Sequence, residues 1–187
     1  REALKQAEQL KVKGYKVSLQ LMGYATYSAF EQLDLKPMLR DAPVDFVYVA
    51  DSYGSIFPDQ IEPLLEPLQS IDKFRVGFHG HNQLQLAFAN TLEAIRCGAD
   101  IIDGTIYGIG RASGNLALET LIAYLQTKQP DRFNVLPLLD VIDSYLIKQM
   151  QQTPWGYQLP YMLSGLFNVH PDYAEYLVNR QEYIIED

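Results

Sequence analysis

The stretch Val76-Gly77-Phe78-His79-Gly80-His81-Asn82 is a short apolar run that ends in two histidines spaced two residues apart. The β-branched and aromatic residues at its start predict a β-strand. Side chains alternate between the two faces of a strand, so His79 and His81 are expected to point the same way. Two imidazoles on one side of a strand end can share one metal ion.

Three similar segments recur along the chain at spacings of about 25 to 30 residues, which is the repeat length of a βα unit. The four predicted strands are Lys16–Met22, Asp45–Ala50, Arg75–His79 and Asp100–Ile106. Near-continuous apolarity in Phe46-Val47-Tyr48-Val49 suits a strand that is covered on both faces. The pattern predicts an α/β fold with four βα units, fewer than the eight of a whole barrel of about 250 residues.

Segments with a helical period follow the strands. After the second, third and fourth strands, helices are predicted over Asp59–Gln69, from an N-cap at Asn82 to Gly98, and over Leu116–Leu125. Beyond the strands, helices are predicted over Leu136–Gln152, Leu159–Asn168 and Asp172–Arg180. We therefore expect a barrel-like domain over residues 1–130 and a helical carboxyl-terminal extension over residues 131–187, which packs beside the barrel or makes an oligomer contact.

The composition favours a globular protein with a small-molecule substrate. Hydrophobic residues make up 48% of the chain and charged residues 20%, which argues against disorder. The formal net charge of −8 argues against a nucleic-acid or anionic-membrane partner. A single cysteine excludes an internal disulfide framework, and no apolar run approaches the roughly 18 residues of a membrane span. We expect a cytoplasmic protein, and the start at Arg1 within a helical pattern is typical of the middle of a longer chain.

Polar side chains gather at the predicted carboxyl ends of the strands, where parallel α/β proteins place their sites. These side chains are Gln20, Tyr24, Asp51, Ser52, His79, His81, Asn82, Asp103 and Thr105. The glycine-rich turn Gly108–Asn115 follows the last strand, and its spacing is also similar to that of a dinucleotide-binding loop. No later strand supplies the acidic residue that such a loop uses, and nucleotide binding leaves the histidine pair unexplained.

These motifs resemble the carboxyl-terminal half of the DRE-TIM metallolyase superfamily (HMG-CoA lyase-like, pyruvate carboxyltransferase domain), and within it the 4-hydroxy-2-oxovalerate aldolases. The matching motifs are VADSYG at Val49–Gly54, HGHN at His79–Asn82, GIGRASGN at Gly108–Asn115, and Glu119. The resemblance covers the chain from about Val17 to Leu125. It implies the carboxyl-terminal half of a TIM (β/α)8 barrel, here with a helical carboxyl-terminal extension.

The resemblance implies a divalent metal, Mn²⁺ or Mg²⁺. The two histidines of the family's His-x-His motif bind this metal, and that role carries over to His79 and His81. In the lyase branch the asparagine of the Gly-Asn pair is a further ligand, which makes Asn115 a third candidate. A helix N-cap is the alternative role for Asn115.

The resemblance also implies catalytic and substrate-binding residues. In the aldolase branch a tyrosine near a Gly-Tyr pair is catalytic, so Tyr157 is a candidate for acid/base catalysis. Asp51 is a second catalytic candidate, and it could also bind the metal, orient the substrate or cap the next segment. Asn82 and Gly110 are expected to lie beside the substrate together with Asp51.

The implied function is a divalent-metal-dependent aldolase or lyase that makes or breaks a carbon–carbon bond of a 2-oxo acid through a metal-stabilised enolate. Neutral imidazole with oxygen ligands suits Mn²⁺, and the open positions let a 2-oxo acid chelate through its carboxylate and ketone. No lysine Schiff base is then required. The alternatives are an acetyl-CoA-dependent condensing synthase, similar to isopropylmalate or homocitrate synthase, and a non-catalytic half barrel that serves as an interaction module.

Two features of the superfamily have no counterpart in this sequence. The Asp-Arg-Glu-type motif of the family's first strand is absent, so we expect a missing amino-terminal half of the barrel to supply it and the isolated chain to be inactive. The glycine-rich turn lacks the cysteine that HMG-CoA lyase carries there, which argues against that activity. The open edges of a half barrel favour self-association, so we expect the isolated chain to form a homo-oligomer.

Overall fold

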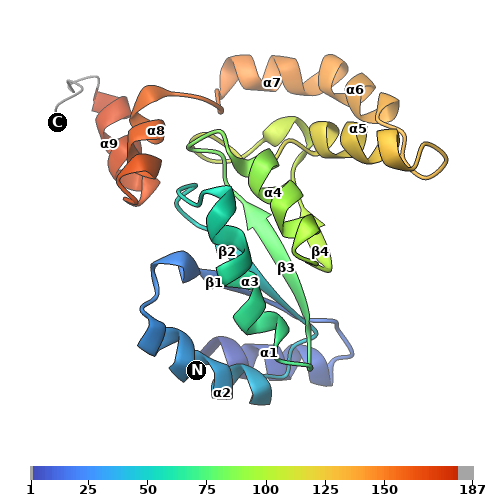
Figure 1. Ribbon diagram of the computed structural model, residues 1–187. Helices are drawn as coiled ribbons and strands as arrows, with labels where there is room; N and C mark the ends of the chain where they lie inside the picture. The colour runs from blue at the N-terminus through green and yellow to red at the C-terminus, as the bar shows by residue number, and fades with distance from the viewer. Residues whose placement is uncertain (1, 181–187) are drawn as a thin grey trace.

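Four parallel β-strands form the centre of the computed structural model, which describes residues 2–180 (Figure 1). The strands are β1 (Ser18–Met22), β2 (Phe46–Asp51), β3 (Arg75–Gly80) and β4 (Ile101–Asp103). They lie in chain order, and each is hydrogen-bonded to the next. Parallel neighbours need a crossover connection, which the helices after each strand supply. The predicted α/β fold with four βα units is confirmed.

Helices occupy most of the remaining chain. They are α1 (Glu2–Val12), α2 (Ala29–Asp41), α3 (Ile61–Gln69), α4 (Ala87–Arg96), α5 (Leu118–Lys128), α6 (Leu136–Val141), α7 (Ile147–Gln152), α8 (Leu159–Leu166) and α9 (Pro171–Arg180). The helix that the sequence predicts over Leu136–Gln152 is continuous, but a π-helical turn at Ile142–Leu146 separates α6 from α7. Short 3-10 turns stand at Tyr24–Thr26, Pro58–Gln60 and Ile106–Gly108.

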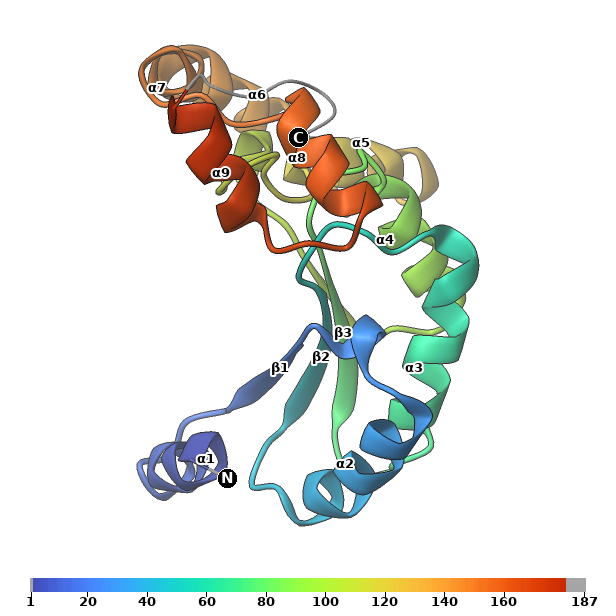
Figure 2. The same cartoon turned by 90° about the vertical axis from the view of Figure 1, so that its left-hand side faces the viewer.

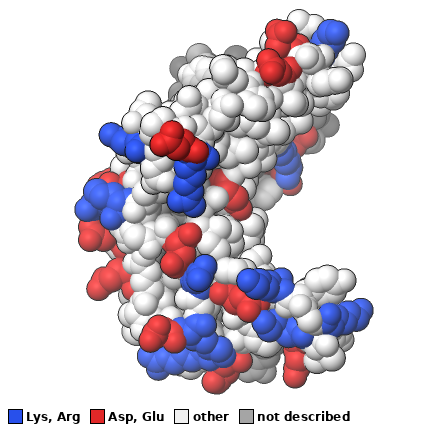
Figure 3. All heavy atoms as spheres, turned by 90° about the vertical axis from the view of Figure 1, so that its right-hand side faces the viewer, with Lys and Arg blue, Asp and Glu red and all other residues white. Residues whose placement is uncertain are grey.

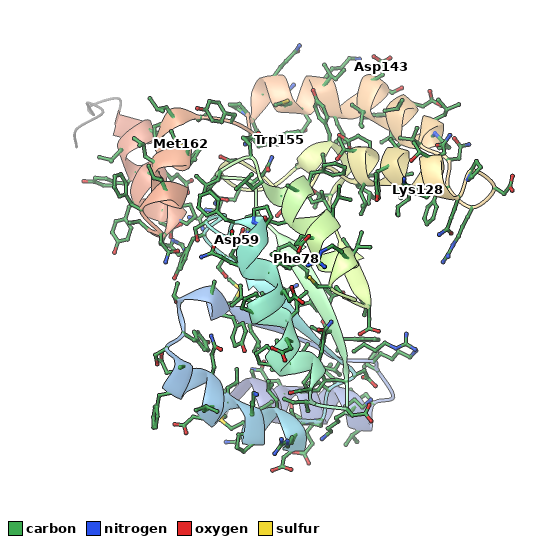
Figure 4. All side chains as sticks on the ribbon, in the orientation of Figure 1. Asp59, Phe78, Lys128, Asp143, Trp155 and Met162 are labelled. Carbon is green, nitrogen blue, oxygen red and sulfur yellow. The ribbon has the colours of Figure 1, made fainter. Side chains whose placement is uncertain are left out.

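One face of the sheet is packed against α2, α3 and α4, which lie on the same side in Figure 2. The most buried strand residues of this core are Val47, Val49, Val76 and Phe78, each at most 1% exposed. Leucines of α2 and α3 and Ala94 of α4 belong to the same cluster. Phe78, labelled in Figure 4, comes from β3 at the middle of this layer. Because strand side chains alternate, the residues between these four point to the other face.

That other face of the sheet is polar and open. The strand register sets Gln20 beside Tyr48, and it sets His79 beside Asp103. Among the described elements no helix lies across this face, and the molecule is hollowed here in the space-filling view (Figures 2 and 3). The hollow corresponds to the inner side of a barrel.

The fourth strand is shorter than predicted, since it ends at Asp103 instead of Ile106. The chain leaves the sheet at Gly104, where a Cβ atom would lie 2.9 Å from the main-chain oxygen of Leu116. The amide of Leu116 donates to the main-chain oxygen of Gly80 at 3.1 Å, which keeps this residue beside the end of β3. The helix predicted to begin at Leu116 therefore begins two residues later, at Leu118.

The predicted N-cap of the helix after β3 is also wrong, because α4 begins at Ala87 and its N-cap is Leu86. Gln85 has a φ of 59°, and such a left-handed residue interrupts a right-handed helix. The Oδ1 atom of Asn82 instead accepts a hydrogen bond from the amide of Ala87 at 3.2 Å across this turn.

The carboxyl-terminal helices α8 and α9 lie beyond the carboxyl ends of the strands, whereas α6 and α7 run beside α5 (Figures 1 and 2). Gly165 of α8 fits closely against the loops that follow β2 and β3, since a Cβ atom there would lie 3.1 Å from the main-chain oxygen of Gly54. Within residues 2–180, none of the helices is both long and apolar enough to span a membrane.

Candidate metal centre

His79 and His81 stand together at the carboxyl end of β3. Their ring centroids are 4.8 Å apart, and the two ring planes are inclined by 88°. The strand ends at Gly80, but an isolated bridge between His81 and Asn115 keeps the chain extended through the second histidine. The prediction that both rings lie on one side of the strand is confirmed.

Each imidazole is oriented by a hydrogen bond at Nδ1. His79 Nδ1 lies 2.6 Å from Oδ1 of Asp103, and His81 Nδ1 lies 2.7 Å from the main-chain oxygen of Asp51. A carboxylate or carbonyl oxygen only accepts, so Nδ1 carries the proton and the lone pair of the neutral ring is at Nε2. Within the part of the chain that the structure describes, neither Nε2 atom has a hydrogen-bond partner. Burial lowers the pKa of His81, which favours the neutral form that binds metals.

Asn115 belongs to the glycine-rich turn between β4 and α5 and lies opposite His81. Its Nδ2 atom donates to the main-chain oxygen of Ile109 at 2.9 Å, which leaves the Oδ1 atom for another partner. Gly110 packs so closely against this amide that a Cβ atom there would collide with it. The N-cap of α5 is Ala117, so the alternative role of Asn115 as the cap of that helix is wrong.

Asp51 is 2% exposed and holds the loop that follows β2. Its carboxylate accepts hydrogen bonds from the amides of Ser55 at 2.9 Å and Ile56 at 3.4 Å. Its main-chain oxygen orients His81, so one residue positions both the loop and a histidine. Burial raises the pKa of Asp51 to about 7. The N-caps of the next turn and of α3 are Phe57 and Gln60, so Asp51 orders the loop and caps neither element. Its contact with substrate or metal stays a prediction.

Replacement of Asp51 by asparagine is expected to change how stability depends on pH. The unfolded chain releases this proton near pH 4 and the folded protein near pH 7, so the free energy of unfolding falls as the pH rises across that window. Between about pH 4 and 7, the free energy of unfolding of the wild type should therefore fall relative to that of Asp51→Asn, by at most about 4 kcal/mol. Above pH 7 the difference between the two proteins should stay constant. Urea denaturation followed by the fluorescence of Trp155 measures both curves. Parallel curves across the whole range would contradict the expectation.

Asn82 and Tyr157 have different surroundings from the histidine pair. The side chain of Asn82 is occupied within its own turn, where Nδ2 donates to Oε1 of Gln85 at 3.5 Å and Oδ1 accepts from Ala87. Tyr157 is 60% exposed. The amide of the preceding residue, Gly156, donates to the main-chain oxygen of Ala112 at 3.1 Å. Tyr157 is therefore attached next to the glycine-rich turn.

The carboxyl-terminal helices hold the loops that carry these residues. Arg111 of the glycine-rich turn forms ion pairs with Asp172 and Glu175 of α9. Ser55 of the loop after β2 donates from Oγ to Oδ1 of Asn168 at 2.8 Å. These contacts join residues that are 64 and 113 positions apart in sequence, which is why sequence patterns do not predict them.

Asp103 contacts His79, and the sequence analysis assigns it no role. Its position at a strand end is predictable, but its pairing with His79 depends on the register of β3 and β4. Among residues 2–180, no group of three or more His, Cys, Asp or Glu side chains is arranged to hold a metal ion. The histidine pair and Asn115 are joined in this region by the backbone bridge between His81 and Asn115.

The sequence profile of the HMGL-like family matches residues 1–151 of this chain. The chain belongs to the HMGL-like family. Among its HMGL-like relatives, the chain is 40% identical over 121 residues to oxaloacetate decarboxylase of Mycobacterium tuberculosis, a match that covers 65% of this chain and 36% of that protein. It is 43% identical over 98 residues to 4-hydroxy-2-oxovalerate aldolase of Roseiflexus sp. strain RS-1, which covers 52% of this chain and 28% of the aldolase. The match thus spans about a third of the length of these relatives.

Two solved structures share the fold of this chain. The amino-terminal domain of a candidate aldolase from Bacteroides vulgatus is similar with a TM-score of 0.84 and 33% identity, over 95% of this chain and 59% of that one. The HMG-CoA lyase of Bacillus subtilis is similar with a TM-score of 0.67 and 21% identity, over 81% of this chain and 55% of the lyase. The second likeness concerns the fold, a parallel α/β arrangement of the TIM-barrel type.

Proposed function

We propose that this HMGL-like chain is the metal-binding part of a lyase that breaks or forms a carbon–carbon bond of a 2-oxo acid. The observation that carries the proposal is the histidine pair at the end of β3. Both Nδ1 atoms are engaged with oxygen acceptors, and both Nε2 atoms are without partners among the described residues. Two imidazoles that are oriented in this way can both bind one metal ion through Nε2.

The donor set fits a divalent cation. His79 and His81 would supply one nitrogen each, and Asn115 would supply Oδ1, because its Nδ2 atom is engaged with Ile109. Mixed nitrogen and oxygen donors are compatible with Mn²⁺, and Mg²⁺ is the alternative. When bound, the cation would supply Lewis acidity that polarises the 2-oxo group of the substrate.

The names of the relatives support a proposal for the substrate class. Oxaloacetate and 4-hydroxy-2-oxovalerate are both 2-oxo acids whose C3–C4 bond can break to leave a pyruvate enolate. In the first case carbon dioxide leaves, and in the second case acetaldehyde leaves. We therefore propose a 2-oxo acid substrate that is cleaved between C3 and C4.

The chain also offers groups for moving protons. An aldol cleavage must remove the proton of the 4-hydroxyl group as the C3–C4 bond breaks. Tyr157 is the proposed proton acceptor, supported by its exposure and by the contact between Gly156 and the glycine-rich turn. Asp51 is the alternative, because its main-chain oxygen contacts His81 and its raised pKa, about 7, suits proton exchange near neutral pH. Asn82 and Gly110 are proposed to contact the substrate as well.

We further propose that a second half barrel covers the polar face of the sheet. The hollow in Figure 3 and the exposed side chains of Gln20 and Met22 on this face of β1 support this idea, since parallel sheets are generally covered on both faces. That half would supply the remaining metal and substrate ligands. The active unit would then be the full-length protein that contains this chain.

Removal of the metal tests the proposed function directly. Full-length protein treated with a chelator and then dialysed is expected to lose pyruvate release from oxaloacetate and from 4-hydroxy-2-oxovalerate, and Mn²⁺ should restore it. A coupled assay with lactate dehydrogenase and NADH measures the pyruvate, and heat-inactivated protein controls for spontaneous decarboxylation. Pyruvate release that is unchanged after chelation, or absent with both substrates in the presence of Mn²⁺, would contradict the proposal.

A further inference from the structure

The two candidate ligands are oriented by acceptors of different kinds. His81 donates to a main-chain oxygen, that of Asp51, whereas His79 donates to a side-chain carboxylate, that of Asp103. A main-chain carbonyl carries no net charge and is present whatever residue occupies the position. The carboxylate is charged and depends on one residue, so the orientation of His79 is specified by Asp103.

The position of Asp103 is determined by rigid elements. The register pairs it directly with His79 on the neighbouring strand, and both side chains lie on the open face of the sheet. Asp103 is the last residue of β4, and the close approach of Gly104 to the backbone of Leu116 fixes where that strand ends. The His79 side chain is 18% exposed and the Asp103 side chain 40%, so the pair borders the hollow.

We propose that Asp103 is a positioning residue that holds His79 with its proton on Nδ1 and thereby increases the affinity of the histidine pair for a divalent cation. A carboxylate that accepts from one imidazole nitrogen increases the electron density on the other and fixes the direction of the ring. This inference rests on the proposed metal-dependent function.

An asparagine at position 103 separates this role from simple packing, because it keeps the shape of the side chain. Its amide can present the oxygen, which leaves the Nδ1–H form in place, or the NH₂ group, which requires a proton on Nε2 of His79. The second form cannot bind a metal through Nε2. Asp103→Asn therefore removes the preference for the metal-binding tautomer without creating a cavity.

Two measurements on the full-length protein test the inference. Calorimetric titration with Mn²⁺ should show binding that is about 10- to 100-fold weaker in Asp103→Asn than in wild type. Nitrogen NMR of the metal-free protein labelled with ¹⁵N-histidine should show His79 as the Nδ1–H tautomer in wild type and as a mixture in the variant. His81 is the internal reference, since its main-chain acceptor is unchanged.

Asp100→Asn is the matched control. Asp100 precedes β4, and its carboxylate accepts from the amide of Val76 at 2.9 Å, so the same chemical change is made at the opposite end of the strand. This variant should bind Mn²⁺ with wild-type affinity. Equal weakening in both variants would overturn the inference, because it would indicate a general effect of changing carboxylates in this part of the sheet.

The outcomes separate this inference from the proposed function. Wild-type Mn²⁺ affinity together with an unchanged tautomer in Asp103→Asn overturns the role of Asp103 and leaves the metal site intact. Absence of Mn²⁺ binding in the wild type overturns the proposed function and this inference together. If Asp103→Asn fails to fold, the wild-type spectrum still decides, since a proton on Nε2 of His79 would contradict the positioning role.

Discussion

Replacement of both His79 and His81 by alanine in the full-length protein is expected to abolish Mn²⁺ binding and to lower the rate of 2-oxo acid cleavage by about 10³-fold or more. Metal-assisted stabilisation of developing charge contributes several kcal/mol, and each 1.36 kcal/mol is a factor of ten in rate. The two rings are 4.8 Å apart and share one side of β3, so the double variant removes both nitrogen donors at once. Calorimetry and the pyruvate assay measure the two effects.

The chain contains a third histidine that serves as the control. His170 has a side chain that is 46% exposed, and its ring contacts Tyr53. Its Nδ1 atom is the acceptor for the amide of Asp172 near the start of α9. His170→Ala should therefore keep Mn²⁺ binding and activity. Equal Mn²⁺ affinity in the wild type and the double variant, with both proteins folded, would refute the histidine pair as the metal site.

Replacement of Trp155 by alanine is expected to lower the free energy of unfolding by about 3 to 5 kcal/mol, the cost typical of removing a buried large aromatic side chain. Trp155 is 7% exposed and lies between α7 and α8, where Figure 4 labels it. Its Nε1 atom donates to the main-chain oxygen of Tyr107 at 2.9 Å, and the two rings meet edge to face at 5.8 Å. One side chain thus joins the carboxyl-terminal helices to the loop after β4.

Two further variants calibrate the effect of Trp155. Trp155→Phe keeps an aromatic ring and loses the hydrogen bond, so a smaller cost of about 1 to 2 kcal/mol is expected. Tyr157→Ala changes an exposed aromatic residue two positions away and should alter stability by less than about 0.5 kcal/mol. Urea denaturation is followed by far-ultraviolet circular dichroism, because Trp155 is the single tryptophan of the chain. A loss below about 1 kcal/mol in Trp155→Ala would show that this contact does not hold the helices on the sheet.

The sheet was predictable because its signals are local. A strand such as Phe46–Asp51 is recognisable from its own apolar residues, and the same spacing rule predicts that His79 and His81 share a side. The predicted boundaries were less accurate where distant residues intervene. β4 ends early because Leu116 packs against Gly104, and α4 begins late because Gln85 takes a left-handed conformation.

The sequence points to the residues of the candidate site, but it does not predict the groups that surround them. The family resemblance and the His-x-His spacing point to His79, His81 and Asn115, and the bridge between His81 and Asn115 brings two of them together. The role of Tyr157 in acid/base catalysis and the role of Asn82 as a substrate contact stay predictions. The attachment of Arg111 to α9 has no signal in the sequence, because a charged residue in a loop is compatible with many partners.

The sequence by itself determined the parallel α/β fold, the histidine pair and the end of the sheet at which polar residues gather. These properties follow from the composition and period of short segments, which each segment carries alone. Only the tertiary structure decided two hydrogen bonds between residues distant in sequence. Asp103 accepts from His79, 24 positions away, and the main-chain oxygen of Asp51 accepts from His81, 30 positions away. Such pairs depend on the register between strands and on where each crossover helix ends, and local patterns do not specify either with the accuracy of a hydrogen bond.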